Sequence, residues 1–318
     1  MDGTAAARQH AHFSDRLAAL VEERSSQVVL GLDPNPANLW PEAIARAESL
    51  EAPPGDRAQL TAEAVARHCR LAIAAAAPAC VAVKPQLACF ERLGSHGWAA
   101  LEQTVAAAHD HGLLVLADGK RGDVAQTAEA YGQALVGRTE GPFGTVEGLG
   151  VDAFTANPLL GRDSLQPLLD AADAAGAGCF VLVRTSNPGA AEIQDQPPDN
   201  PLRDRLARLV AELGADRVGS SGLSDVAAVT GATRPELLGE LRELMPQAVF
   251  LLPGIGAQGG SADALGPAFA PHPAAGLVAA SRSIVDAHTQ VGGDPAFAAQ
   301  AAAEALRATA WRIATGGA

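Results

Sequence analysis

Eight short apolar segments, separated by longer stretches with helical periodicity, constrain the fold of this chain more than any other feature of its sequence. Each segment consists mainly of Val, Leu, Ala and Phe, which is typical of strands buried on both faces of a parallel sheet. Strands that alternate with amphipathic helices predict an α/β protein, and eight of them favour a closed (β/α)8 TIM barrel over an open doubly wound sheet. The segments occupy residues 28–33, 80–85, 113–117, 151–155, 179–183, 226–229, 248–252 and 276–280.

The stretches between these segments carry hydrophobic residues at helical spacing. We expect one barrel domain over residues 1–318, with residues 1–12 as a flexible N-terminal tail. A first helix at 13–24, with Ser14 as its N-cap, precedes the barrel. The other predicted helices occupy residues 59–77, 98–111, 127–136, 165–175, 202–213, 235–245 and 295–313.

Polar residues stand at the carboxyl ends of most of the predicted strands. In a (β/α)8 barrel these ends meet at one mouth, where such folds carry out their chemistry. We therefore expect a polar pocket at this end of the barrel. The residues concerned are Asp33, Lys84, Asp118, Lys120, Asn157, Arg184, Thr185, Ser186 and Arg282, together with the glycine-rich loop 253–260.

The third strand carries the most charge, because it runs directly into the sequence DGKRGD of residues 118–123. Period-two alternation puts Asp118 and Lys120 on the same side, and Asp123 follows on the loop. The chain has 21 arginines but two lysines, Lys84 and Lys120, and both stand at predicted strand ends. Since only lysine readily gives up a proton, these positions indicate sites that need an ammonium group. The alternative is a solvated turn with a surface ion pair.

Glycine and positive charge meet after the last two strands, the corner where barrels of this type commonly bind phosphate. The loop 253–260, PGIGAQGG, offers backbone N–H groups and the Gln258 amide, and Arg282 follows the eighth strand. Together these groups suit a phosphate dianion. The loop has neither the G-K-[ST] of a Walker motif nor the position of a Rossmann motif, and an ordinary glycine turn is the alternative.

Composition excludes several classes of function. A formal net charge of −13 with no basic block argues against a nucleic-acid-binding protein. No apolar run approaches the roughly 18 residues that span a bilayer, so we expect no membrane association. Because the N-terminal residues contain no signal-peptide core, we expect a soluble, cytoplasmic protein.

The residue spacing does not favour a metal site. His109 and His111 are alternate residues at a helix end, which is not the spacing of paired ligands, and we expect them on the polar surface. The cysteines lack any C-x-x-C pair, which favours reduced, buried thiols at Cys69, Cys80, Cys89 and Cys179.

Seven sequence elements in chain order resemble orotidine 5′-phosphate decarboxylases, and in particular their longer bacterial (type 2) subfamily. The resemblance covers roughly residues 13–313, and the D-x-K-x-x-D pattern in register with the other strand ends is its most specific part. Departures are Gly119 where Ala is more usual, Ser281 in place of Gly before Arg282, and long segments at 137–150 and 190–225. The elements are GLDP at 31–34, VKPQ at 83–86, ADGKRGDVAQT at 117–127, NP at 157–158, RTSNP at 184–188, PGIGAQGG at 253–260 and SRSI at 281–284.

The resemblance implies a reaction that needs neither cofactor nor metal. Its substrate is orotidine 5′-monophosphate, which loses CO₂ from C6 of the pyrimidine to give UMP, the last step of de novo UMP synthesis. Lys120, beside Asp118 and Asp123, would stay protonated, stabilise the C6 carbanion and then protonate it. Lys84 would hold Asp118 and a ribose hydroxyl in place.

The resemblance also implies contacts to the rest of the nucleotide and a homodimer with shared active sites. Asp33 would accept a hydrogen bond from the ribose, and Ser186 would contact the pyrimidine edge. Gln258 and Arg282 would bind the phosphate. Asp123 and Thr127 would reach into the site of the partner subunit.

Two other functions compete with this interpretation. A Mg²⁺-dependent sugar-phosphate decarboxylase or aldolase on the same barrel would need an extra carboxylate directly after Asp118, where this chain has Gly119. A catalytically silent sensor of phosphate ligands would need neither both lysines nor three acids. Arg121, although inside the motif, is expected to be structural or an ion-pair partner.

Overall fold

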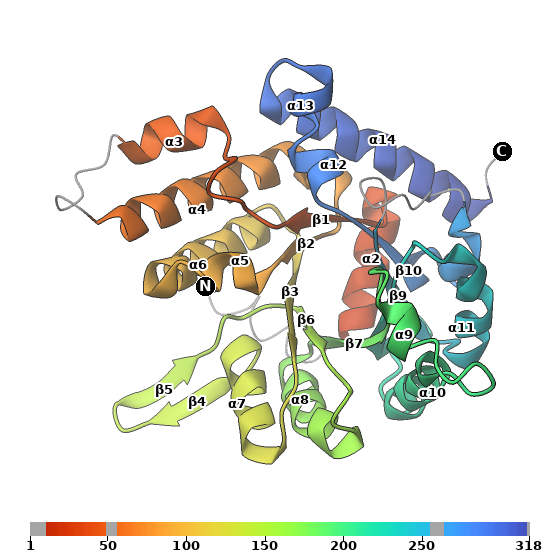
Figure 1. The fold of residues 1–318 in the computed structure, drawn as a ribbon. Coiled ribbons are helices and arrows are strands. Elements are labelled where there is room, and N and C mark those ends of the chain that lie inside the picture. The colour runs from red at the N-terminus through yellow and green to blue at the C-terminus, as the bar shows by residue number, and fades with distance from the viewer. Residues whose placement is uncertain (1–10, 49–55, 255–263, 317–318) are drawn as a thin grey trace.

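Eight parallel strands close into a barrel in the computed structural model, which describes residues 11–48, 56–254 and 264–316 (Figure 1). Neighbouring strands follow chain order, and the first strand closes the ring by pairing with the last, Val28 opposite Val278. The predicted (β/α)8 barrel is confirmed. Its strands are β1 (Val28–Leu32), β2 (Ala82–Pro85), β3 (Leu114–Arg121), β6 (Ala153–Ala156), β7 (Gly178–Arg184), β8 (Ser224–Thr230), β9 (Ala248–Pro253) and β10 (Gly276–Ala280).

Both faces of the barrel wall are apolar. Alternate residues of a strand point to opposite faces, and in these strands both sets of residues are largely hydrophobic. In β1, Val29 belongs to the cluster inside the barrel, whereas Val28 and Leu30 belong to the larger cluster between strands and helices. The interior is therefore a packed core rather than a channel. Large side chains that fill it are Leu116, Phe180, Val249, Leu251 and Leu277.

Long helices surround the strands. Side-chain caps fix the start of two of them: Asp56 accepts a hydrogen bond from Gln59 N, and Asp294 accepts one from Phe297 N. No helix in the described part of the chain is long and apolar enough to cross a membrane. The long helices are α4 (Arg57–Ala76), α6 (Gly94–Asp110), α7 (Ala125–Leu135), α8 (Arg162–Ala175), α10 (Leu202–Gly214) and α14 (Pro295–Thr315), and the shorter α11 (Leu238–Leu244) lies between β8 and β9 in the chain.

The helix α2 (Phe13–Arg24) packs against the amino-terminal end of the barrel. Phe13 meets Phe180 of β7 edge-on, with ring centroids 5.9 Å apart. The predicted N-cap role of Ser14 is wrong, because the helix already begins at Phe13 and Ser14 is buried within its first turn. The backbone N–H of Ser14 donates instead to the Asp225 carboxylate of β8, at 2.8 Å.

The same carboxylate also holds the residue before the helix. His12 Nδ1 lies 2.7 Å from Asp225 Oδ2, and this hydrogen bond raises the pKa of the imidazole. Residues 1–10 of the predicted flexible tail lie outside the described residues. At residue 12 the prediction of a tail is wrong, since His12 is tied to the barrel.

A buried polar cluster surrounds Asp152, just before β6. Its Oδ2 accepts from Val115 N at 3.0 Å and lies 2.9 Å from His109 Nε2, while Arg16 pairs with Oδ1. Burial alone would raise the pKa of Asp152, but His109 and Arg16 lower it to about 2. The prediction of a solvent-exposed His109 is therefore wrong, because its side chain is only 22 % exposed, whereas His111 is exposed.

The glycine-rich segment 137–150 forms a β-hairpin, which the sequence did not predict. Its strands, β4 (Arg138–Gly141) and β5 (Gly144–Glu147), project from the barrel at the lower left of Figure 1. Every residue of both strands is exposed, so no alternation of buried side chains marks them in the sequence. Phe143, in the turn between them, is fully exposed.

Short helical elements complete the connections. Most of them span one turn or two, too short for a hydrophobic period to be recognised. They are α3 (Pro41–Glu48), α5 (Leu87–Glu91), α9 (Ala190–Ile193), α12 (Arg282–Val285) and α13 (His288–Val291), with 3₁₀ turns at Ala77–Ala79, Pro235–Leu237, Gly266–Phe269 and Pro273–Ala275.

Candidate active site

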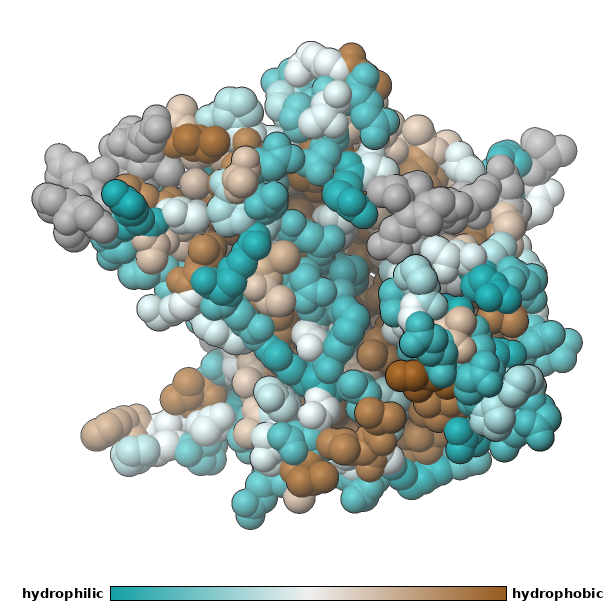
Figure 2. Space-filling view, in the orientation of Figure 1, coloured by the Kyte–Doolittle hydropathy of each residue, from teal (hydrophilic) through white to brown (hydrophobic). Residues whose placement is uncertain are grey.

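A pocket of about 500 Å³ opens at the carboxyl ends of the barrel strands, as predicted. This volume is typical of a small-molecule site. Figure 2 shows a mainly hydrophilic surface around the hollow near the centre of this face. Apolar side chains of Val229 and Leu251 border the pocket between its polar groups, which are Asp33, Lys84, Gln86, Asp118, Lys120, Thr155, Thr185, Ser186, Asn187, Ser281, Arg282 and Ser283.

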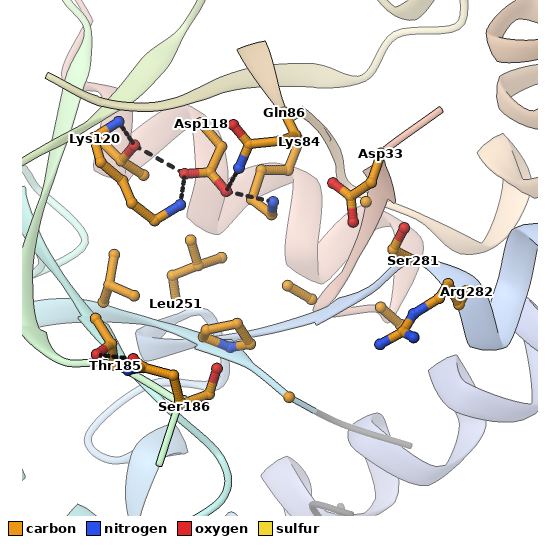
Figure 3. A pocket seen from close by; sticks show the side chains of 18 of the residues that line it. Asp33, Lys84, Gln86, Asp118, Lys120, Thr185, Ser186, Leu251, Ser281 and Arg282 are labelled. Atoms are coloured by element: carbon orange, nitrogen blue, oxygen red, sulfur yellow. Dashed lines mark hydrogen bonds and ion pairs between the residues drawn. The ribbon is translucent and has the colours of Figure 1, made fainter. Parts of the chain in front are cut away.

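The Asp118 carboxylate is the centre of a row of hydrogen-bonded side chains (Figure 3). Lys84 Nζ lies 2.6 Å from its Oδ2, and Lys120 Nζ lies 2.6 Å from its Oδ1. Gln86 Nε2 also donates to Oδ2, at 3.3 Å, and the Thr155 hydroxyl donates to Oδ1, at 3.0 Å. Groups at the ends of β2, β3 and β6 thus converge on one carboxylate.

Electrostatics keep this row charged. Burial alone would raise the pKa of Asp118, but the ammonium groups of Lys84 and Lys120 lower it to about 2. Burial also opposes the charged form of Lys84, yet Asp118 and Asp33 raise the pKa of that ammonium above its usual value. The Lys84 side chain is 10 % exposed and that of Lys120 is 41 % exposed. Lys120 is therefore the ammonium more open to a bound molecule.

An arginine and a second carboxylate occupy another part of the pocket. Asp33 directly follows β1, and Arg282 begins α12, separated from the end of β10 by one residue. Figure 3 shows Arg282 and Asp33 at one end of the pocket and Ser186 across it from Lys120 and Asp118. Ser281, which precedes Arg282, has a φ of −116°, so the glycine more usual in this position is not required by the backbone.

Arg184, predicted at the mouth, is buried and turns elsewhere. Its Nη2 donates to Asp195 at 3.0 Å, and Arg203 donates to the same carboxylate at 2.9 Å. Burial opposes the charge of Asp195, but the two guanidinium groups outweigh it and lower its pKa. The group of Arg184, Asp195 and Arg203 anchors the segment after β7, which carries Ser186.

Other predicted site residues lie outside this cavity. Asp123 accepts a hydrogen bond from Val124 N at 2.8 Å, and Thr127 is exposed in the first turn of α7. Neither lines the cavity described here. Asn157 does not line it either, and accepts from Leu159 N at 3.0 Å. Gln258 and most of its loop fall in 255–263, outside the described residues.

Arg121 has the structural role predicted for it. Its guanidinium pairs with Glu91 of α5 and lies over the ring of Tyr131, 5.4 Å from the centroid. Arg121 therefore links β3 to α5 and α7 and points away from the cavity lining.

The family described as Orotidine 5′-phosphate decarboxylase / HUMPS matches residues 26–300. The chain belongs to this family. It is 41 % identical over 285 residues to an orotidine 5′-phosphate decarboxylase of Rhodopirellula baltica, an alignment that covers 87 % of this chain and 89 % of the relative. It is 45 % identical over 233 residues to one of Deinococcus radiodurans, with 73 % and 80 % covered.

Solved structures agree with this assignment. A Streptomyces avermitilis protein, described as a candidate orotidine 5′-phosphate decarboxylase, superposes with a TM-score of 0.73 at 31 % identity and covers 96 % of each chain. The family and the barrel predicted from the sequence are both confirmed.

Two of the side chains that donate a hydrogen bond to Asp118 in this decarboxylase-family site, Gln86 and Thr155, were not predicted as site residues from the sequence. Gln86 lies two positions after Lys84 at the end of β2, so period-two alternation would have placed both side chains on one side. Thr155 lies two positions after Ala153 in β6, and Ala153 belongs to the interior cluster. The same alternation would have predicted that the Thr155 hydroxyl points inward.

Proposed function

We propose that this protein is an orotidine 5′-phosphate decarboxylase that converts orotidine 5′-monophosphate to UMP and CO₂. The observation that carries this proposal is the row Lys84, Asp118, Lys120, in which a buried carboxylate is paired with two ammonium groups at the barrel mouth. The relatives with over 40 % identity bear the same activity in their names.

The chemistry requires a place for an electron pair. When the bond between C6 and the carboxylate breaks, its electrons stay on C6 and CO₂ leaves. The Lys120 ammonium would stabilise that charge and then give its proton to C6, and solvent would return the proton to Lys120. The substrate carboxylate would lie near Asp118, whose charge Lys84 holds in place. We infer that these side chains act without a cofactor or metal ion.

The rest of the nucleotide would occupy the other groups of the pocket. Arg282 would bind the phosphate dianion, together with Gln258 of the loop 253–260. Asp33 would accept a hydrogen bond from a ribose hydroxyl, and Ser186 would contact the pyrimidine edge. The separation of Arg282 from the Lys120 end of the pocket in Figure 3 supports this orientation.

We further propose a homodimer with shared active sites, in which Asp123 and Thr127 complete the site of the partner subunit. Both residues follow β3 at the mouth of the barrel, yet neither lines the cavity of its own chain. Exposed apolar side chains lie on the segments that follow β3 and its neighbour β6: Val124 is 54 % exposed and Leu159 is 73 % exposed. Exposed apolar groups around a mouth favour a protein interface there.

The alternative of a Mg²⁺-dependent sugar-phosphate enzyme meets a steric obstacle. Such an enzyme would need a carboxylate at position 119, but a Cβ on Gly119 would lie 2.7 Å from Leu87 Cδ1. Leu87 is fully buried and would have to move. In the described ranges, no three His, Cys, Asp or Glu side chains are grouped to hold a metal ion.

The deciding assay follows the ultraviolet absorbance of orotidine 5′-monophosphate, with EDTA present throughout. We expect absorbance loss and UMP formation at a rate unchanged by the chelator. A strict requirement for Mg²⁺ would favour the sugar-phosphate alternative, and a protein inactive with and without Mg²⁺ would contradict the proposed function.

A further inference from the structure

The strand pair β3 and β6 loses its regular register at the catalytic residues. Ala117 lies opposite Phe154, and Arg121 lies opposite Ala156. Four residues further along β3 thus correspond to two residues along β6. Asp118 and Lys120 lie in this irregular part, and Thr155 is the β6 residue that faces it. Such irregularities locally disrupt the ladder and redirect side chains.

Lys120 has an unusual backbone conformation there. Its φ is +49°, in the left-handed region that non-glycine residues seldom occupy. A residue persists in this region only when its surroundings hold it. The backbone N–H of Lys120 donates to the Thr155 hydroxyl, at 2.8 Å.

The same hydroxyl also holds the carboxylate. Thr155 Oγ1 donates its hydrogen to Asp118 Oδ1, at 3.0 Å, and Lys120 Nζ donates to that same oxygen. A hydroxyl has one hydrogen and two lone pairs, so it can accept from Lys120 N and donate to Asp118 at once. Thr155 is 1 % exposed and is a pocket-lining residue. Its β-branched side chain has restricted rotation at χ1, which keeps the hydroxyl in place.

We propose that Thr155 is a positioning residue for the decarboxylation: its hydroxyl fixes the backbone of Lys120 and the carboxylate of Asp118 relative to each other. It acts through these two groups rather than on the substrate. The kinetic part of this proposal rests on the proposed function, whereas the structural part does not.

The structural part is tested by amide hydrogen exchange in protein labelled with ¹⁵N-lysine. The chain has two lysines, so the spectrum contains two backbone signals, and the Lys84 signal serves as an internal reference. In Thr155→Val, which removes the hydroxyl but keeps the side-chain shape, we expect the Lys120 amide to exchange about tenfold faster or more. In Thr155→Ser, which keeps the hydroxyl, protection should be restored. Unchanged exchange in Thr155→Val would overturn the proposal.

A matched control is Thr230→Val. Thr230 lies on β8 and is also 1 % exposed, but its hydroxyl has no hydrogen-bond partner in the described part of the chain. The same substitution there should leave both lysine amides and turnover unchanged. If Thr155→Val does not fold, Thr155→Ala replaces it in the same measurements. Faster exchange of Lys120 in Thr230→Val as well would contradict a specific role of Thr155.

The kinetic part is tested with the same variants. Because misplacing a reacting group by about 1 Å can cost roughly 100-fold in rate, we expect kcat of Thr155→Val to fall by about 10- to 100-fold. UMP should bind with a dissociation constant within about twofold of wild type, since its proposed contacts are elsewhere. Thr155→Ser should recover most of kcat.

The two possible failures are distinguishable. If wild-type protein does not decarboxylate orotidine 5′-monophosphate, the proposed function is wrong, and the exchange experiment still decides the structural role of Thr155. If wild-type protein is active but Thr155→Val has wild-type kcat, or Thr155→Ser is equally impaired, the positioning role is wrong.

Discussion

Lys84 Nζ lies 2.6 Å from Asp118 Oδ2, and both side chains are at least nine-tenths buried. Two opposite charges removed from water depend strongly on each other, so loss of one partner leaves a costly unpaired charge. Lys84 therefore serves chiefly to keep Asp118 ionised and fixed beside Lys120. The proposed chemistry depends on this arrangement before any substrate binds.

Buried carboxylates with low pKa values predict how stability changes with pH. Asp118 and Asp152 both have a pKa of about 2, below the usual value of 3.8. Because the folded pKa is lowered, the stabilisation is present above about pH 4 and is lost as the pH falls through about 2. We expect the free energy of unfolding to decrease over this window. Urea unfolding at several pH values measures it.

Asp152→Asn isolates one of these contributions. Asp152 lies before β6, at the end of the barrel opposite the pocket, so turnover should be unchanged. At about 1.4 kcal/mol per pKa unit, we expect a loss of about 2–3 kcal/mol at pH 7, with the difference from wild type vanishing near pH 2. A loss of stability independent of pH would contradict the role given to the Asp152 charge.

Arg282→Ala tests the phosphate site. A hydrogen bond to a charged group contributes about 1.5–3 kcal/mol, so UMP should bind about 10- to 100-fold more weakly. Uridine, which lacks the phosphate, should bind as it does to wild type. Titration calorimetry with both ligands makes the comparison, and equal losses for UMP and uridine would remove Arg282 from the phosphate site.

Mixing two inactive variants tests the shared site. If Asp123 serves the partner subunit, a heterodimer of Lys120→Ala and Asp123→Asn has one site with both lesions and one with neither. Random exchange of equal amounts should then restore about a quarter of wild-type sites, given two-fold symmetry. Absence of recovery, after mass spectrometry has confirmed subunit exchange, would mean that Lys120 and Asp123 act in the same site.

Much of the fold and site could be predicted because its determinants are local. Continuous apolar runs mark the buried strands, and the polar residue that ends a run lies at the carboxyl end of the barrel, where most such residues reach the pocket. Asp33, Lys84, Asp118, Lys120, Ser186 and Arg282 were predicted as pocket residues in this way, and all of them line it.

The errors arise where partners distant in sequence decide the structure. Arg184 follows the inward-facing Leu182 by two residues, so alternation predicts that it also faces inward. The register of β7 against β8 shifts between Leu182 and Arg184, however, and the Arg184 guanidinium pairs with Asp195. Ser14 resembles an N-cap in the sequence, yet its backbone N–H donates a hydrogen bond to Asp225, which is over 200 residues away. The role of Thr155 likewise depends on the irregular register of β3 against β6, which the residue types of β3 do not predict.

The turnover of Lys120→Arg tests the central claim, proton delivery by Lys120, most directly. Arginine keeps the positive charge beside Asp118 but scarcely gives up a proton. We expect near-complete loss of UMP formation, with the melting temperature and UMP binding close to those of wild type. A variant that still decarboxylates orotidine 5′-monophosphate at the wild-type rate would show that Lys120 supplies charge alone, and would contradict the proposed mechanism.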